Sequence, residues 1–259
     1  MAPKHVARRR ATGASRRVIK RLAAAGPGRN LVSPVAKTLK CLVCLGCPQP
    51  FLQIVYLLMT NSALDTTCIV GLLELCAGAG NCGKAFAKND VICRSMDIKY
   101  DAVRDNILGD VGYANTVVNA LQLAPGSMAI MGPVCSSWVF MNRGTSARAR
   151  WQPLGNEELE SASSANVMVA RLVLVILILE IKNVWWVLEQ PASSLMQHHG
   201  KFKWLCDTID VWRQFVYMGS FGARSKKPSY LLLQPRRGWA SWQRPPAREP
   251  EQRGHHQVL

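Results

Sequence analysis

The chain has 259 residues, 49% apolar and 19% charged, and its 32 Lys and Arg against 16 Asp and Glu give a formal net charge of +16. This composition excludes a disordered acidic chain, a collagen-like repeat and a small disulfide scaffold. A chain of this length can bury its apolar surface in one domain and still carry terminal extensions. Nine cysteines scattered through apolar segments favour reduced thiols in an intracellular protein over a secreted one.

Residues 1–64 form a basic amino-terminal segment with eleven Lys or Arg, no carboxylate and an apolar stretch near its end. Apolar and basic side chains fall on opposite helical faces around residues 16–23. Such a start is typical of an organellar transit peptide. The alternative is a solvated basic arm that contacts nucleic acid or carries a nuclear address. We therefore expect the protein in the nucleus or an organelle.

Two apolar stretches, residues 41–59 and 167–179, raise the possibility of membrane insertion. The first is interrupted by Pro48 and Pro50, and the second is short and contains Arg171. A membrane-spanning helix needs about 20 continuous apolar residues. We therefore expect no stable membrane insertion, and a buried helix over the second stretch.

Three cysteines in a CxxCxxC run at residues 41–47 resemble part of an iron–sulfur ligand set. A fourth thiolate ligand would be needed. The His pairs at 198–199 and 255–256 have no Cys or acidic partner at ligand spacing. The sequence therefore predicts no metal site.

Strand-like and helix-like segments alternate through residues 65–233, as in an α/β fold with a mainly parallel sheet. We predict strands at 68–75, 91–96, 127–131, 184–188, 214–218 and 229–233, and helices at 81–88, 113–123, 156–182 and 194–207. The last two strands form an antiparallel hairpin, with Pro228 at an edge. The predicted fold is a doubly wound, mostly parallel sheet, followed by a flexible basic tail at 234–259.

A glycine-rich turn at residues 76–80 lies between the first strand and its helix, where the backbone can approach a ligand closely. Asp97, 19 residues after Gly78, would end the next strand, where a carboxylate can accept both hydroxyls of a ribose. Glu74 would lie near a cationic end of the ligand. No Lys-Ser/Thr follows the glycines, which disfavours a nucleoside triphosphate. The pattern predicts a site for adenosine linked to an amino acid, as in S-adenosylmethionine.

Residues 74–80, Glu-Leu-Cys-Ala-Gly-Ala-Gly, resemble the first motif of class I S-adenosylmethionine-dependent methyltransferases, in the Asp-Leu-Phe-x-Gly-x-Gly form of the cytosine-C5 DNA methyltransferases. Cys76 replaces the Phe that stacks on adenine in that family. Residues 109–111, Gly-Asp-Val, are similar to its Gly-Asp-Ile, and the resemblance assigns the adenine amino group to Asp110. The resulting cofactor-binding set is Glu74, Cys76, Gly78, Gly80, Asp97, Asp110 and Pro133.

Residues 132–135, Gly-Pro-Val-Cys, resemble the Pro-Cys nucleophile loop of the same family, and residues 189–191, Glu-Gln-Pro, resemble its Glu-Asn-Val. Both would follow neighbouring strands, at the sheet edge where α/β proteins bind ligands. Because C5 of cytosine is a poor nucleophile, a thiolate adds at C6 while a carboxyl group protonates N3. The resemblance implies Cys135 as nucleophile and Glu189 as acid. Alternatively, Cys135 is a small residue in a tight turn and Glu189 caps the following helix.

The charge indicates DNA or RNA as a partner, because cations contact phosphates and Trp rings stack on unpaired bases. Candidate contacts are Arg143, Arg148 and Arg150 after the nucleophile loop, and Arg236, Arg237, Trp239, Trp242, Arg244, Arg248 and Arg253 in the tail. A solvated basic surface is the alternative.

Two functional hypotheses follow. The first is methyl transfer to a nucleic-acid base of the cytosine-C5 type. The resemblance covers residues 68–233 without a target-recognition domain, so base specificity would either come from elsewhere, for example from a partner chain, or be absent. The second is a non-catalytic module that binds nucleic acid through its basic extensions, since residues 133–136 and 189–191 depart from the family motifs.

Overall fold

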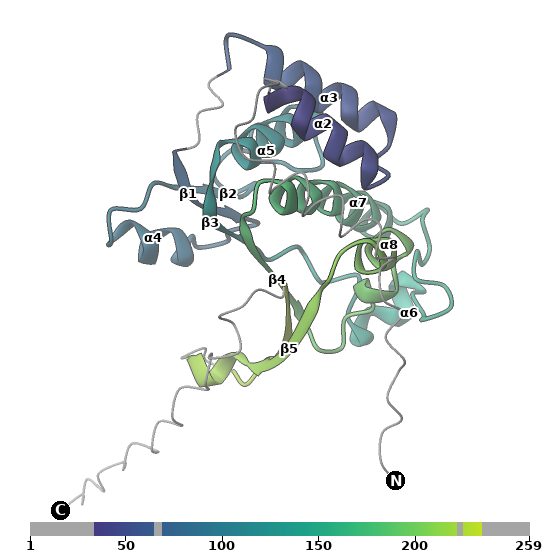
Figure 1. Cartoon of the computed structure of the whole chain (residues 1–259). Coiled ribbons are helices and arrows are strands. Elements are labelled where there is room, and N and C mark those ends of the chain that lie inside the picture. The colour runs from purple at the N-terminus through teal and green to yellow at the C-terminus, as the bar shows by residue number, and fades with distance from the viewer. Residues whose placement is uncertain (1–33, 65–68, 222–224, 235–259) are drawn as a thin grey trace, which may run out of the picture.

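The computed structural model describes residues 34–64, 69–221 and 225–234. Predictions for the arm before residue 34 and for the tail after residue 234 lie outside the described residues. The described chain forms one sheet with helices packed against it (Figure 1). The α/β class predicted from the alternating pattern is confirmed.

A six-stranded mixed sheet runs in the order β2-β1-β3-β4-β6-β5. The strands are β1 (Val70–Leu75), β2 (Cys93–Met96), β3 (Leu123–Met131), β4 (Trp185–Pro191), β5 (Trp212–Tyr217) and β6 (Pro228–Leu233). Strands β2, β1, β3 and β4 are parallel, whereas β6 is antiparallel to both β4 and β5. The predicted mostly parallel sheet with a carboxyl-terminal antiparallel pair is confirmed; the doubly wound arrangement stays a prediction.

The order of strands reverses direction at β1. From β1 the chain first reaches β2 on one side and then returns to β3 on the other. In open α/β sheets such a reversal leaves a crevice at the carboxyl ends of the two central strands, where ligands bind. The residues that follow β1 and β3 are therefore the first place to look for a site.

Helices α2, α3, α5 and α7 lie together on one side of the sheet, while α4 packs on β1 and β2 apart from that layer (Figure 1). The helices are α2 (Pro34–Cys44), α3 (Gln49–Thr60), α4 (Asn81–Ala87), α5 (Asp110–Gln122), α6 (Arg143–Ser146), α7 (Glu160–Ile181) and α8 (Gly200–Thr208), with 3-10 turns η1 (Phe140–Asn142), η2 (Met196–His198) and η3 (Met218–Phe221). The core lies between this layer and the sheet.

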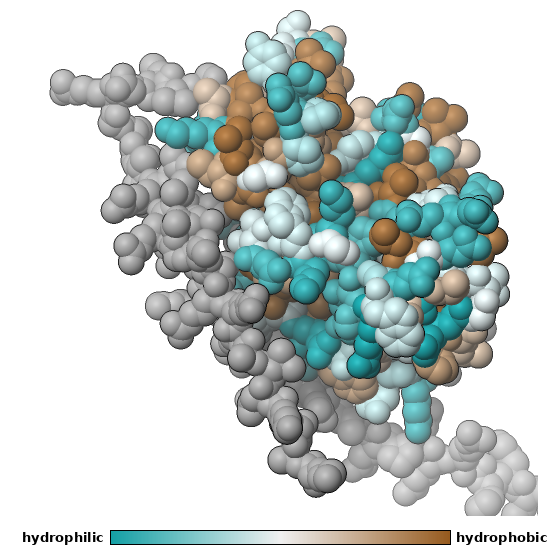
Figure 2. Space-filling model, turned by 90° about the vertical axis from the view of Figure 1, so that its right-hand side faces the viewer, coloured by the Kyte–Doolittle hydropathy of each residue, from teal (hydrophilic) through white to brown (hydrophobic). Residues whose placement is uncertain are grey.

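The apolar stretch before residue 64 is part of this core. It forms α2 and α3, separated by a turn at Gly46 with φ +77° and by Pro48, which precedes α3. Leu42 and Val55 are fully buried in the same cluster as the strands. Apolar side chains also gather at the top of the surface in Figure 2, the level at which Figure 1 has α2 and α3.

Helix α7 is the one helix within the described ranges that is long and apolar enough to cross a membrane. However, 67% of its most apolar window is buried inside the protein. A helix that is apolar on all sides is expected in the core of a soluble protein as well as in a membrane. No strong tendency to insert into a membrane is indicated.

Candidate functional site

The glycine turn, residues 76–80, joins β1 to α4 through three left-handed residues. Cys76, Gly78 and Gly80 have φ values of +56°, +58° and +66°. The Gly78 amide donates to Oδ2 of Asp97 over 2.8 Å, and the Tyr100 hydroxyl donates to the Gly78 carbonyl over 3.1 Å. The structure thus brings together the predicted pair of Gly78 and Asp97.

The two glycines of this turn face different surroundings. A methyl group at Gly80 would lie 2.7 Å from the hydroxyl oxygen of Tyr100, whereas one at Gly78 would have no atom within 4 Å. The backbone at Gly78 therefore faces open space. Asp97 accepts from the amides of Gly78 and Lys99, and a carboxylate has about four acceptor positions. Acceptor positions on Asp97 therefore remain for further donors, and its contact with a ribose stays a prediction.

Glu74 is buried beneath the turn, with 5% of its surface exposed. Its carboxylate accepts from the amides of Cys82 and Gly83 at the start of α4 and from the hydroxyl of Ser95. Gly80 is the residue that caps α4 and has no side chain to accept from the first amides of the helix. The Glu74 carboxylate accepts from them instead, and its negative charge is favourable at the positive end of the helix. Contact with the cationic end of a ligand stays a prediction.

Cys76 lies where the two central strands meet. Burial raises the pKa of its thiol to about 12, and the nearby charge of Asp97 contributes. The Gly132 amide donates to the Leu75 carbonyl over 3.1 Å, and a methyl group at Gly132 would lie 3.7 Å from the Cys76 carbonyl oxygen. Cys76 is therefore a neutral thiol at physiological pH, and the glycine turn begins next to the segment after β3.

The Cys135 loop, residues 132–139, follows β3 and carries the predicted nucleophile half-buried. The amides of Trp138 and Val139 donate to the Cys135 carbonyl over 2.9 and 3.2 Å. Trp138 is 1% exposed, and its carbonyl accepts from the Leu195 amide over 2.9 Å. The loop is therefore a closed turn fixed by a buried aromatic ring.

Arg148 packs under this loop and is 1% exposed. Its guanidinium lies 3.5 Å from the centre of the Trp138 ring and donates to Asn166 over 2.8 Å. Its other acceptors are the Ser137 hydroxyl and the carbonyls of Pro153, Leu154 and Ala162. Burial lowers its pKa to about 10, so it stays charged at neutral pH. Sequence reasoning grouped Arg148 with surface phosphate contacts, but in the structure this side chain anchors the loop.

At the end of β4, Gln190 is the side chain that reaches the Cys135 loop. It is 2% exposed, donates to the Pro133 carbonyl over 2.9 Å and accepts from the Ser194 hydroxyl over 2.9 Å. Sequence reasoning noted Gln190 only as a departure from a motif. The available signal was an uncharged polar residue close behind the apolar run at residues 184–188.

Glu189 makes its contacts with β6 and the residue before it. Its carboxylate accepts from the Ser229 hydroxyl over 2.6 Å and forms an ion pair with Lys227 at 3.3 Å. Neighbouring residues of a strand point to opposite faces, so Glu189 and Gln190 leave β4 on different sides. Among the described residues, the side chain of Gln190, and not that of Glu189, is hydrogen-bonded to the Cys135 loop.

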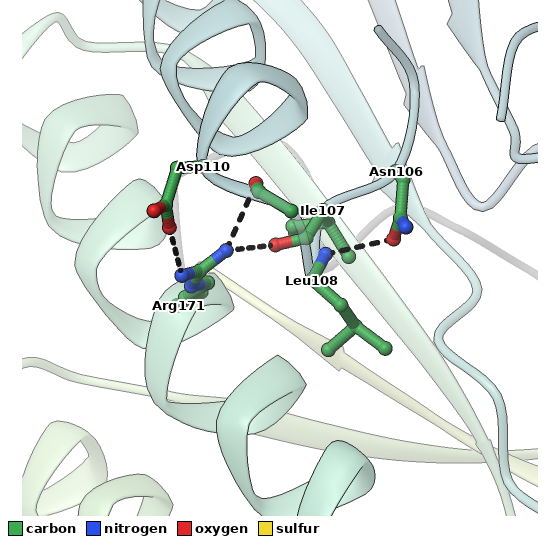
Figure 3. Close-up of polar contacts among 6 residues, drawn as sticks. Asn106, Ile107, Leu108, Asp110 and Arg171 are labelled. Carbon is green, nitrogen blue, oxygen red and sulfur yellow. Dashed lines mark hydrogen bonds and ion pairs between the residues drawn. The ribbon is translucent and has the colours of Figure 1, made fainter. Parts of the chain in front are cut away.

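Asp110 begins α5 on the protein surface, with its side chain 98% exposed. Figure 3 shows its carboxylate facing Arg171 of α7, at 2.9 Å. The same guanidinium donates to the Ile107 carbonyl over 2.8 Å (Figure 3). It also donates to the Gly109 carbonyl over 3.0 Å. The structure thus joins Asp110 to α7, and its predicted role at an adenine stays a prediction.

In comparisons with known proteins, the chain matches no family model and no curated protein. Any functional assignment therefore rests on the geometry of the site. Within residues 34–64, 69–221 and 225–234, no group of three His, Cys, Asp or Glu side chains could hold a metal ion. The observed site is a glycine turn open at Gly78, next to a Cys loop that Arg148 and Gln190 hold in place.

Proposed function

We propose that the chain transfers a methyl group from S-adenosylmethionine to a nucleic-acid base, with C5 of cytosine as acceptor. Cys135 is the nucleophile and Glu189 the acid. The observation that carries the proposal is the hydrogen bond from the Gly132 amide to the Leu75 carbonyl. It continues the pairing of β1 with β3 to the point where the glycine turn and the Cys135 loop begin side by side, at the strand reversal where α/β sheets bind ligands. Methyl transfer of this type requires the methyl donor and the Cys135 thiolate to lie beside the same base.

The cofactor fits the glycine turn through two features. The open space at Gly78 allows its backbone to be approached closely, and Asp97 retains acceptor positions for ribose hydroxyls. Bound there, S-adenosylmethionine supplies an electrophilic methyl group on a sulfonium. The raised pKa of Cys76, about 12, keeps this thiol neutral and prevents it from competing for the methyl group, because the thiolate is the reactive form.

The residues of the chain prepare the acceptor carbon. The Cys135 thiolate bonds to C6 of cytosine, and the electron pair of the C5–C6 double bond becomes available at C5 while Glu189 protonates N3. C5 then bonds to the methyl carbon as the carbon–sulfur bond of the donor breaks and leaves its electron pair on sulfur. Loss of the C5 proton to water restores the double bond and expels the Cys135 thiolate, and N3 returns its proton. Ser229 and Lys227 fix the position of the Glu189 carboxylate.

Methyl transfer from labelled S-adenosylmethionine to DNA and to RNA tests the proposal. Wild-type protein should label one polymer, and Cys135→Ser should lower the rate at least about 1,000-fold, because a serine hydroxyl is barely ionised at neutral pH. Cys44→Ser is the matched control, since Cys44 is an exposed thiol on α2. Transfer by Cys135→Ser at the wild-type rate would contradict the assignment of the nucleophile.

A second candidate is a methyltransferase-like module that binds nucleic acid without catalysis. The observation in its favour is that Gln190 occupies the contact with the Cys135 loop. Such a module would bind DNA or RNA in a salt-sensitive way, and Glu189→Gln would not alter that binding. Calorimetry with S-adenosylmethionine separates the two candidates first, because an enzyme must bind the methyl donor.

A further inference from the structure

The antiparallel end of the sheet carries a row of aromatic side chains on one face. Arg213, Phe215 and Tyr217 alternate along the edge strand β5 and so point to the same side. Tyr230 of β6 is paired directly opposite Phe215. These four side chains are named here the β5 surface.

The β5 surface is ordered and accessible. Phe215 and Tyr217 are 39% and 50% exposed. The Phe215 ring meets the rings of Tyr217 and Tyr230 edge-on, at centroid distances of 5.0 and 5.5 Å. The Arg213 guanidinium lies 4.4 Å from the centre of the Tyr230 ring and donates to Gln197 over 2.7 Å. A continuous platform of rings with a stacked cation therefore faces solvent.

This surface borders the candidate active site. In the strand register Tyr230 is opposite Gln190 of β4, so both side chains belong to the same face. A shallow hollow lined by Gln190, Arg213 and Tyr230, among others, lies between them. Gln190 in turn donates to the Pro133 carbonyl in the Cys135 loop. The rings thus lie on the Gln190 face of the sheet, next to a side chain that holds the Cys135 loop.

Further cations lie near this surface. Burial lowers the pKa of His198, and the positive charges of Arg150, Arg213 and Lys203 lower it further, so these three cations lie within electrostatic range of His198. Arg150 stands with Trp151 at the tip of a tight turn closed by hydrogen bonds between Ala149 and Gln152. Trp151 is 83% exposed. Neither β5 nor β6 contains a carboxylate.

We propose that the β5 surface binds single-stranded nucleic acid, with bases stacked on its rings and phosphates held by Arg213 and the neighbouring cations, and directs it toward Cys135. Aromatic rings interleaved with cations match unpaired nucleotides, because each base has a face to stack and each link a charge. In a duplex these base faces are covered. The end point at Cys135 rests on the proposed function, while the binding chemistry does not.

Fluorescence anisotropy of the full-length protein with a labelled oligothymidylate of about 12 nucleotides tests the proposal. Phe215→Ala and Tyr217→Ala should each weaken binding about 10-fold, because each removes one stacking platform. Arg213→Gln should reduce the slope of log affinity against log salt by about 0.7, one phosphate contact on a single strand. A duplex of the same length should bind less tightly and be insensitive to Phe215→Ala.

Trp212→Ala is the matched control, because Trp212 belongs to the same strand, is 43% exposed and points to the other face. Its affinity should equal that of the wild type. Equal losses for Trp212→Ala and Phe215→Ala would overturn the proposal, as would a β5 surface that mediates self-association in sedimentation and leaves the oligonucleotide unbound. If one ring variant fails to fold, as judged by circular dichroism, the other ring variant and Arg213→Gln decide.

The two proposals fail separately. Cys135→Ser should keep wild-type affinity for the oligonucleotide while losing methyl transfer. If the protein transfers no methyl group but Phe215→Ala weakens its binding of the oligonucleotide, the β5 surface is supported as a binding site and the proposed methyltransferase activity is rejected. If the protein transfers methyl groups and Phe215→Ala binds the oligonucleotide as tightly as the wild type, only the proposal for the β5 surface is rejected.

Discussion

The glycine turn and the Cys135 loop follow neighbouring strands, but they are held in different ways. In the turn, Gly78 is fixed by Asp97, which lies 19 residues away in the sequence. In the loop, Pro133 is fixed by Gln190, 57 residues away, and the ring of Trp138 by the buried Arg148. The comparison teaches that the turn is held within one strand–turn–helix–strand unit, whereas the loop that carries Cys135 depends on Arg148 and Gln190, which lie outside its own strand–turn unit.

The largest effect is expected from removal of the buried cation under the loop. Arg148→Met should lower the free energy of unfolding by about 4 kcal/mol, because it leaves buried carbonyl and side-chain acceptors without a donor. Urea unfolding followed by circular dichroism measures this loss. The exposed neighbour provides the control, since Arg150→Met should change the free energy by less than about 0.5 kcal/mol. Equal effects of the two substitutions would show that the loop does not depend on Arg148.

This dependence explains how much of the site could be predicted from sequence. The strands were predicted to within a few residues because β1, β3 and β4 are apolar runs bounded by turns, and Gly78 with Asp97 was predicted because their spacing reflects one strand–turn–helix–strand unit. The role of Arg148 was not predicted. Most of its acceptors are backbone carbonyls, whose positions no pattern of side chains in the sequence indicates.

The same limit applies at β4 and before β1. Sequence reasoning selected Glu189 by resemblance, but the face to which a side chain points at the end of β4 depends on register with β6. Helices α2 and α3 were not predicted as core elements, because the apolar character of residues 41–59 alone does not reveal which surface they cover.

The pH dependence of stability gives a smaller effect in the same loop. His199 is buried edge-on against Trp138, at 5.7 Å between ring centroids, and burial with the charge of Arg148 lowers its pKa from 6.5 to about 4. As the pH falls from 6.5 toward 4, His199 is therefore protonated in the unfolded chain but stays neutral in the folded protein. Stability is full above this window, and about 3 kcal/mol should be lost across it.

Urea unfolding at several pH values measures this loss as a slope. His199→Gln cannot titrate, so its free energy of unfolding should fall less steeply between pH 6.5 and 4. Carboxylates titrate in both proteins, and only the difference between the two slopes reports on His199. Identical slopes would place the His199 ring in contact with water.

The smallest effects are expected in the glycine turn, and they should divide stability from binding. Gly80→Ala places a methyl group 2.7 Å from the Tyr100 hydroxyl oxygen at φ +66°, so the free energy of unfolding should fall by about 2 kcal/mol. Gly78→Ala has the same kind of backbone strain, with φ +58°, but meets no atom within 4 Å, and should cost only about 1 kcal/mol. Because its methyl group enters the open space in which we propose that the cofactor binds, Gly78→Ala should nevertheless weaken S-adenosylmethionine binding more than Gly80→Ala does.

Gly126→Ala is the control that separates the effect of backbone strain from the effect of contact with S-adenosylmethionine. It has φ +83° and open space around it, but it lies within β3, before the carboxyl end that faces the turn. Gly126→Ala should therefore lower stability as much as Gly78→Ala while leaving calorimetric binding of S-adenosylmethionine unchanged. If Gly78→Ala binds the cofactor like Gly126→Ala, the space at Gly78 is only a consequence of the turn, and the motif would describe how β1 is connected to α4 without describing a ligand site.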